Sequence, residues 1–217
     1  MIKNFKGAIF DLDGTLIDSN GIWKQIDIDF LGKRGFTVPT DYMAAISHLG
    51  AYGCALYTID RFQLNETPES LIEEWTCMAK KAYSTTIKLK PYVKDFLQYL
   101  HKNEIPMAIA TASQLELALP VLENNNVLSY FHSITTISEV NRGKGFPDIY
   151  EKAASKLGLC ATDCVVFEDI LKGIQGANLG NFYTIGVFDE HSKEDMNKIK
   201  KEANHYIYCY SELLKNI

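Results

Sequence analysis

Short runs of apolar residues recur along the chain, and most are rich in β-branched or small side chains. Runs of this kind, separated by polar segments, are typical of strands that are buried on both faces of a parallel sheet. Helical patterning fills most of the intervals, and this alternation predicts an α/β fold. The predicted strands are 7–10, 105–110, 133–136, 164–167 and 182–187, the predicted helices are 92–102, 115–124, 148–157 and 170–179, and a last strand and helix are predicted at 206–208 and 212–215.

One part of the chain, residues 18–86, shows helical patterning without a convincing strand. Its clearest helix begins after Thr67, because a threonine N-cap followed by Pro68 and early acidic residues is a typical helix start. We therefore predict a core of residues 1–17 and 87–217 that carries residues 18–86 as an inserted helical cap. The candidate cap helices are 21–33, 41–47, 51–62 and 68–83, and the predicted hinges are 14–18 and 88–91.

The composition narrows the class of protein. Of the 217 residues, 47% are hydrophobic and 23% are charged, which fits a folded protein and argues against disorder, collagen-like repeats and membrane spanning. The first apolar stretch ends at Asp11, too early for a signal peptide or a membrane helix. The five cysteines include no C-x-x-C pair and fit reduced thiols better than disulfides or a zinc site. These features predict a cytoplasmic protein.

The charge of the chain bears on its partners. A net charge of −5 argues against general nucleic-acid binding. We interpret the short basic run of Lys198, Lys200 and Lys201 as a solvated helix face. Neither nucleic acid nor membrane is therefore expected as a partner, and the oligomeric state stays open.

Two carboxylates follow the first predicted strand. Asp11 and Asp13 are two residues apart on an extended backbone, so both side chains face the same side. Gly14 then permits a sharp turn at the carboxyl end of the strand, where open α/β sheets bind ligands. A calcium loop is the alternative, but an EF-hand would need glycine and a bidentate acid where the sequence has Leu16 and Ile22.

A second acidic pair, Glu168 and Asp169, ends the predicted strand 164–167. Acids at two strand ends can share one cation, and Mg²⁺ prefers such oxygen ligands together with water and a substrate phosphate. Lys144 lies in a glycine-flanked turn and is a candidate to neutralise a phosphate. Thr111 ends another strand and is a candidate hydroxyl donor. Taken singly, a loop lysine is more often solvated and a strand-end threonine is more often a helix cap.

The order of these residues along the chain resembles the haloacid dehalogenase (HAD) superfamily, in its phosphatase and phosphomutase branch with a helical cap after the first strand. The resemblance spans nearly the whole chain. It is carried by DLDGTLIDS at 11–19, TAS at 111–113, GKGFPD at 143–148, and FED at 167–169 followed by Gly173-Ile174.

This resemblance implies a Rossmann-like parallel-sheet core with an inserted α-helical cap, and it implies roles for individual residues. Asp11 is the expected nucleophile and Asp13 the expected general acid/base. The expected phosphate ligands are Thr111, Ala112 and Lys144, and the expected Mg²⁺ site comprises Asp11, Asp13, Glu168 and Asp169. Two positions depart from the family pattern: Gly145 stands where proline usually follows the lysine, and Tyr92 stands where glycine usually follows Pro91.

The resulting hypothesis is a Mg²⁺-dependent phosphatase that acts on a small phosphorylated metabolite, a sugar phosphate or a nucleotide, through an aspartyl phosphate. A dehalogenase would need neither a metal nor a second aspartate. A β-phosphoglucomutase-like enzyme remains an alternative, although Trp23 occupies the place of its cap histidine and no arginine lies between Arg34 and Arg61. A catalytically idle binding protein of the same fold is the other alternative.

The cap residues Trp23, His48 and Tyr52 are candidate contacts for substrate specificity. Aromatic and histidine side chains on such helices serve more often in packing. The identity of the substrate is not predicted beyond its class.

Overall fold

The computed structural model describes residues 5–46 and 49–215. The chain divides into two compact units, Met1–Asn20 with Ile87–Ile217, and Gly21–Thr86. The first boundary falls three residues later than the predicted one after residue 17. The reason is that the backbone N–H of Asp18 donates to the carbonyl of Lys88 at 3.0 Å, which ties this segment to the first unit.

The first unit is built on a six-stranded, all-parallel sheet with the strand order β3-β2-β1-β4-β5-β6. The order reverses between β1 and its neighbours, so the carboxyl end of β1 is the switch point of the sheet. This architecture confirms the predicted α/β class. The strands are β1 (Gly7–Phe10), β2 (Met107–Thr111), β3 (Phe131–Thr136), β4 (Cys164–Glu168), β5 (Tyr183–Val187) and β6 (His205–Ile207).

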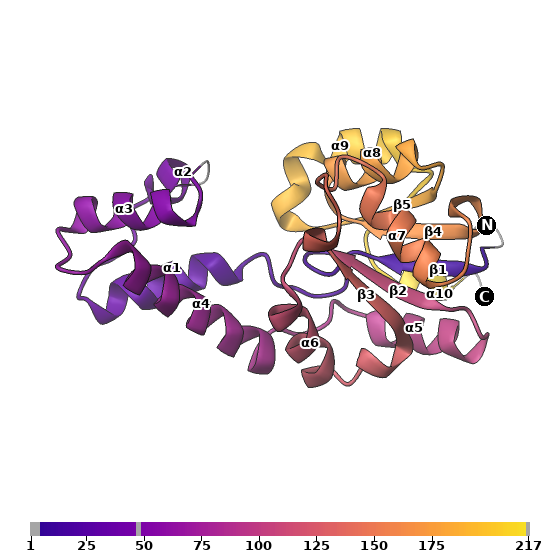
Figure 1. Cartoon of the computed structure of the whole chain (residues 1–217), viewed down its shortest axis with the longest axis horizontal. Coiled ribbons are helices and arrows are strands. Elements are labelled where there is room, and N and C mark those ends of the chain that lie inside the picture. Colours follow the sequence, from indigo (N-terminus) through magenta and orange to yellow (C-terminus); the bar gives the residue numbers. More distant parts are fainter. Residues whose placement is uncertain (1–4, 47–48, 216–217) are drawn as a thin grey trace. The chain divides into compact units, whose positions relative to one another are not determined.

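Helices cover both faces of this sheet (Figure 1). One face carries α5 (Val93–Lys102), α6 (Leu115–Asn124) and α10 (Ser211–Leu214), and the other carries α7 (Asp148–Lys156), α8 (Leu171–Leu179) and α9 (Met196–Glu202). Short 3₁₀ turns are η1 (Leu128–Tyr130), η2 (Ile137–Glu139), η3 (Ala161–Asp163) and η4 (Glu190–Asp195). The predicted strands and helices of this unit are all present, with ends that shift by no more than two residues.

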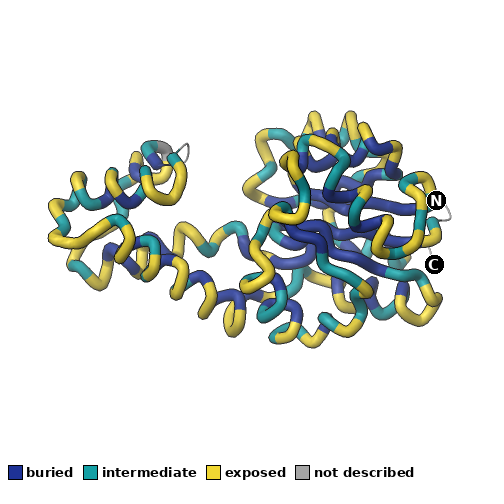
Figure 2. Tube along the Cα trace, viewed as in Figure 1, coloured by how far each residue is buried: buried dark blue, intermediate teal, exposed yellow. Residues whose placement is uncertain are grey.

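The central strands are buried on both faces, and they form the dark core of the tube in Figure 2. On one face Phe10 stacks on Phe167 with ring centroids 4.5 Å apart, and Phe96 of α5 meets both rings edge-on. On the other face Ile9 and Tyr150 share a buried cluster that includes α7. Burial on both sides explains why these strands are nearly continuous apolar runs.

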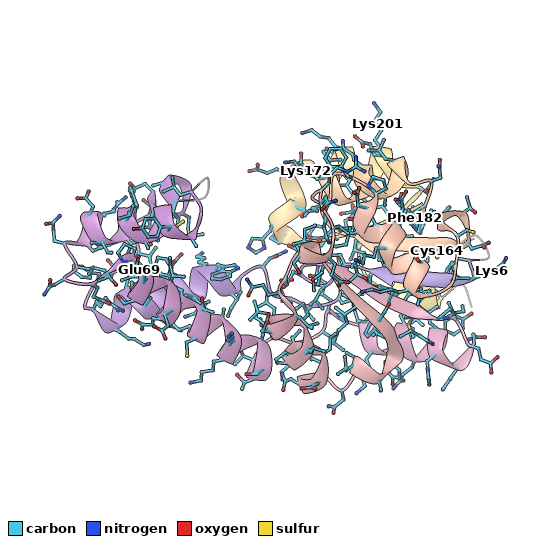
Figure 3. All side chains as sticks on the ribbon, viewed as in Figure 1. Lys6, Glu69, Cys164, Lys172, Phe182 and Lys201 are labelled. Atoms are coloured by element: carbon cyan, nitrogen blue, oxygen red, sulfur yellow. The ribbon has the colours of Figure 1, made fainter. Side chains whose placement is uncertain are left out.

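Lysine side chains on the outer helices of the first unit point away from the sheet. Figure 3 shows Lys172 and Lys201 projecting away from α8 and α9, whereas Cys164 and Phe182 belong to the buried cluster on the α7 face. Each of the five cysteines, all of them among the described residues, is a free thiol.

The second unit is helical. It consists of α1 (Ile22–Lys33), α2 (Tyr42–Ile46), α3 (Ala51–Phe62) and α4 (Pro68–Thr85). Its own apolar cluster includes Phe30 and Trp75, whose ring centroids are 5.3 Å apart. Thr67 caps α4 as predicted, because its hydroxyl accepts the N–H of Ser70 at 3.2 Å. Among the described residues, no helix is both long enough and apolar enough to cross a bilayer.

Candidate active site

The sheet places the two predicted acidic pairs side by side. Strands β1 and β4 are neighbours with Phe10 opposite Phe167, so Asp11 emerges next to Glu168 and Asp169. The backbone N–H of Asp11 donates to the carbonyl of Phe167 at 3.0 Å and extends this pairing by one residue. Asp11, Glu168 and Asp169 are all buried, and one carboxylate oxygen from each lies within 4.8 Å of the others. Three acids therefore meet at the switch point of the sheet.

Lys144 lies among these acids. Its ammonium group contacts Asp11 Oδ1 and Glu168 Oε1, and the lysine is only 8% exposed. The loop that carries it packs tightly on α8, because a Cβ on Gly176 would come within 2.0 Å of the carbonyl oxygen of Lys144. Close packing at Gly176 thus helps to fix a loop in which Gly145 replaces the proline usual in the family.

Burial and charge shift the proton equilibria of these groups. Burial raises the pKa of Asp11 well above its usual value, and although Lys144 opposes this, the carboxylates of Glu168 and Asp169 raise it further. Burial, together with Glu168, raises the pKa of Asp169 to about 6. Burial alone would lower the pKa of Lys144, but the charges of Asp11 and Glu168 outweigh it and raise that pKa. One lysine cannot balance three acids, so the cluster favours a further positive charge.

Thr15 and Gly14 complete the turn after β1. The Thr15 hydroxyl lies 3.1 Å from Asp11 Oδ2 and 3.0 Å from Asp169 Oδ1, so it can donate to either carboxylate. Gly14 has φ +77°, and a Cβ there would come within 2.4 Å of Asp169 Oδ2. Glycine is required at this position both by its backbone conformation and by the approach of the carboxylate.

Asp13 is held apart from the three-acid cluster. Its Oδ1 accepts from the Ser19 hydroxyl at 2.7 Å and its Oδ2 from the Ser113 hydroxyl at 2.6 Å. Thr111 supports this arrangement, because its own hydroxyl oxygen accepts the backbone N–H of Ser113 at 2.9 Å. The described acids whose oxygens cluster within 4.8 Å of one another do not include Asp13.

An open cavity of about 310 Å³ joins these residues. It is lined by Asp11, Asp13, Asn20, Ala112, Lys144, Asp169, Ile170, His191 and Ser192. Among the predicted site residues, Thr111 and Glu168 are fully buried and are not among those lining the cavity. The cavity is therefore bounded by acids that follow β1 and β4, by Ala112 after β2, by Lys144 from the loop before α7, and by the loop after β5.

Several residues at the site were not anticipated. Thr15, Ser19 and Ser113 belong to the same sequence segments as the predicted acids and Thr111, so a hydroxyl within these segments is the signal that could have marked them. His191 and Ser192 come from the loop after β5, where no motif marks the sequence. Only the fold brings them to the cavity.

The predicted specificity residues belong to the helical unit. Trp23 on α1 and Tyr52 on α3 are each about half exposed. His48 lies outside the described residues. The role of these three side chains in substrate recognition stays a prediction.

A parallel sheet with clustered acids and a buried lysine at the carboxyl ends of its strands defines a hydrolase of the HAD type. The sequence agrees, since residues 8–187 match the model of the haloacid dehalogenase-like hydrolase family. The chain belongs to that family.

Individual relatives cover most of the chain. It is 28% identical over 187 residues to the fructose-1-phosphate phosphatase YqaB of Escherichia coli (strain K12). The matched region covers 86% of this chain and 98% of the relative. It is 26% identical over 207 residues to a probable pseudouridine-5'-phosphatase of Drosophila melanogaster, and this match covers 90% of this chain and 87% of the relative. The β-phosphoglucomutase structure from Clostridium difficile superposes with a TM-score of 0.70 at 20% identity over 96% of this chain and 93% of that one, a likeness that shows the fold alone.

Proposed function

We propose that the protein is a Mg²⁺-dependent phosphatase that hydrolyses a small phosphorylated metabolite through an aspartyl phosphate on Asp11. The observation that carries this proposal is the position of Asp11, which lines the open cavity with Lys144 against one oxygen and Asp169 close by. A sugar phosphate is the favoured substrate within the sugar phosphate and nucleotide classes. The relative from Escherichia coli supports this choice, because fructose 1-phosphate is a sugar phosphate. Pseudouridine 5'-phosphate, the substrate named for the Drosophila relative, is a nucleotide that also carries its phosphate on a primary hydroxyl of a sugar.

The donor set fits Mg²⁺. Asp11, Glu168 and Asp169 offer hard oxygen ligands within 4.8 Å of one another. When ionised, the three carboxylates carry more negative charge than the one positive charge of Lys144 can neutralise. We assign Asp11 and Asp169 as side-chain ligands, with Glu168 and the Asp13 segment completing the predicted site. When bound, Mg²⁺ would supply positive charge to the phosphoryl oxygens in the transition state.

Asp11 is the proposed nucleophile. Its carboxylate attacks the phosphorus in line while the bond to the leaving oxygen breaks, and a phosphoryl group is then bonded to Asp11. Lys144 favours the ionised form of Asp11 against the effect of burial, and it lies where negative charge accumulates on the phosphoryl oxygens. The proposed roles of Ala112 and Thr111 are to hold the phosphate, through the backbone of the first and the hydroxyl of the second.

Asp13 is the proposed general acid and base. It gives a proton to the departing alkoxide, and the alcohol leaves. It then takes a proton from the water that attacks the aspartyl phosphate, which releases inorganic phosphate and restores Asp11. Hydrogen bonds from Ser19 and Ser113 hold both of its oxygens, so its carboxylate is oriented before the substrate binds.

The two units would divide the work. We assign the chemistry to residues 1–17 and 87–217 and the choice of substrate to the inserted residues 18–86, with Trp23 and Tyr52 as candidate contacts. The four acids of the site, Lys144 and, apart from Asn20, the lining of the cavity all lie in residues 1–17 and 87–217. The phosphomutase alternative draws support only from a likeness of fold.

Purified protein assayed on a panel of phosphate esters, with fructose 1-phosphate, hexitol phosphates and nucleoside 5'-phosphates included, tests this function. We expect Mg²⁺-dependent release of phosphate that is greatest on a sugar phosphate. Asp11→Asn, which is almost isosteric, should remove turnover while the protein stays folded. Full activity of that variant, free of wild-type contamination and of deamidation, would rule out the aspartyl-phosphate mechanism.

A further inference from the structure

The loop after β5 contains a buried carboxylate that the proposed chemistry does not use. Asp189 is 5% exposed and accepts hydrogen bonds from three residues. Lys90 Nζ lies 2.8 Å from Oδ2, while Asn20 Nδ2 lies 3.1 Å and the backbone N–H of His191 lies 2.9 Å from Oδ1. A buried charge is tolerated only when it is paired in this way, so these contacts are a built arrangement rather than a chance encounter of surface groups.

Two of these partners come from the segments by which the chain leaves the first unit and returns to it. Asn20 is the last residue of that unit before the insert, and Lys90 lies just after the return at Ile87. The two segments also pair with each other, since Asp18 N–H donates to Lys88 O at 3.0 Å and Lys90 N–H donates to Leu16 O at 2.9 Å.

Asp189 thus binds a side chain from each of the two segments that form a short antiparallel ladder, Lys90 within it and Asn20 two residues beyond it. The ladder includes a bridge between Ile17 and Leu89. Lys90 is fixed a second time by the Phe188 carbonyl, 2.7 Å from its Nζ. The loop after β5 is consequently joined to both crossings, that is, to the segment by which the chain leaves the first unit and the segment by which it returns.

The same loop reaches the acids. The Ser192 hydroxyl donates to Asp169 Oδ2 at 3.3 Å, and the Ser192 N–H donates to the carbonyl of Asp189 at 3.2 Å. Asn20 packs directly over the turn of the first acidic pair, because a Cβ on Gly14 would come within 2.3 Å of its Nδ2. Asn20 and Ser192 both line the cavity. Asp189 therefore connects the entry to the insert with the carboxylate assigned to the metal.

We propose that Asp189 is a positioning residue of the active site, which orients Asp169 through Ser192 and fixes the two crossing segments through Asn20 and Lys90. It touches no reacting atom. The inference rests on the proposed function in one respect, namely that Asp169 serves as a metal ligand. Loss of Asp189 should disturb the metal site and the crossings together, although they are separate parts of the unit.

Asp189→Asn and Asp189→Ala test this proposal, with Asp195→Asn as the matched control. Asp195 lies in the same segment, its side chain is about half exposed, and it pairs only with Lys198 among the described ion pairs. Mg²⁺ binding, measured by calorimetry on substrate-free protein, should weaken about 10-fold to 100-fold in the Asp189 variants, the usual effect of removing a partner that orients a metal ligand. The control should bind Mg²⁺ as the wild type does.

Hydrogen exchange followed by NMR reports on the crossings. The amide hydrogens of Asp18 and Lys90 should exchange roughly 10-fold faster in the Asp189 variants. The two segments that these amides join would have lost their contacts with Asp189 and would open more often. Ser192→Ala should weaken Mg²⁺ binding without changing that exchange. This contrast separates the two arms of the proposal.

A lower melting temperature with unchanged Mg²⁺ affinity and unchanged exchange would make Asp189 a structural residue only and would overturn the proposal. If Asp189→Ala does not fold, Asp189→Asn, which keeps the shape of the side chain, decides by the same two readouts. Wild-type protein that binds no Mg²⁺ and hydrolyses no phosphate ester would overturn the proposed function and this inference together. Wild-type activity with unaffected Asp189 variants would overturn this inference alone.

Discussion

Tyr150 donates a hydrogen bond of 2.7 Å from its phenol to Oε1 of Glu168, the same oxygen that contacts Lys144. Tyr150 is fully buried on α7, and Glu168 is fully buried at the end of β4. A helix on one face of the sheet therefore fixes the carboxylate that helps to hold Lys144 against Asp11. The reactive end of the sheet is supported from inside the core.

Tyr150→Phe should test this support. The change removes one hydrogen bond from a buried, charged acceptor and should lower the free energy of unfolding by about 1–3 kcal/mol. It should also lower kcat by a smaller factor than Lys144→Ala does, because Lys144 keeps its contact with Asp11. Urea unfolding and steady-state kinetics measure the two effects. A variant with normal stability and normal kcat would show that the bond contributes nothing.

Asp169→Ala should weaken the activation of the enzyme by Mg²⁺ far more than Cys160→Ala does, because Asp169 is an assigned metal ligand and Cys160 is an exposed thiol. Activity measured against Mg²⁺ concentration after chelator treatment gives the comparison. Chelator-treated wild type that works as well as the Mg²⁺-loaded enzyme would contradict the metal assignment.

Asp13→Asn should reduce the rate by roughly 10²-fold to 10⁴-fold, the usual contribution of a general acid/base. The loss should be smaller on nitrophenyl phosphate than on an alkyl phosphate, because nitrophenolate leaves without a proton. Ser113→Ala, which removes one hydrogen bond to Asp13, should show the same pattern with a smaller loss. Equal losses on both esters, in conditions where the first chemical step limits turnover, would remove Asp13 from the leaving-group step.

The raised pKa of Asp169 predicts how the stability of metal-free protein depends on pH. Burial and Glu168 raise this pKa from 3.8 to about 6, so between these values the folded state holds a proton that the unfolded state has lost. Stability must then fall as pH rises from about 4 to about 6. Thermal unfolding without metal should show this fall in the wild type, and Asp169→Asn should reduce it. An unchanged pH profile in the variant would assign the effect to other groups.

Trp23 and Tyr52 allow the division of labour between the units to be tested. Substitution of either residue by alanine should change kcat/KM between natural phosphates by about 10-fold to 200-fold, the scale of one altered apolar contact. The kcat/KM for a small generic phosphate ester should stay unchanged in these variants, whereas Lys144→Ala should lower kcat/KM for every substrate. If the Trp23 and Tyr52 variants stayed folded and lost activity evenly over a broad panel, the insert would serve to exclude water instead.

The positions of the main acids of the site could be predicted from the sequence, because these acids directly follow apolar strands. Asp11 and Asp169 could be placed at one edge from this fact alone. Thr111 was expected to bind a phosphate, and this stays a prediction; in the structure Thr111 is fully buried and its hydroxyl oxygen accepts the Ser113 N–H. Contacts made by loops were beyond prediction, as the pairing of Ser192 with Asp169 shows. The two residues are 23 positions apart in the sequence, with α8 and β5 between them, and no periodic signal connects them.

The ladder between Ile17 and Leu89 has a consequence for how such a chain can be rebuilt. The insert leaves the first unit and returns to it at hydrogen-bonded neighbours, so the ends of any replacement segment need to be only one strand spacing apart. Exchange of whole inserts between relatives at this point should leave the sheet register untouched, as is usual where domain insertion succeeds. New substrate ranges are then accessible by transplanting one contiguous segment, while the acids and Lys144 stay as they are.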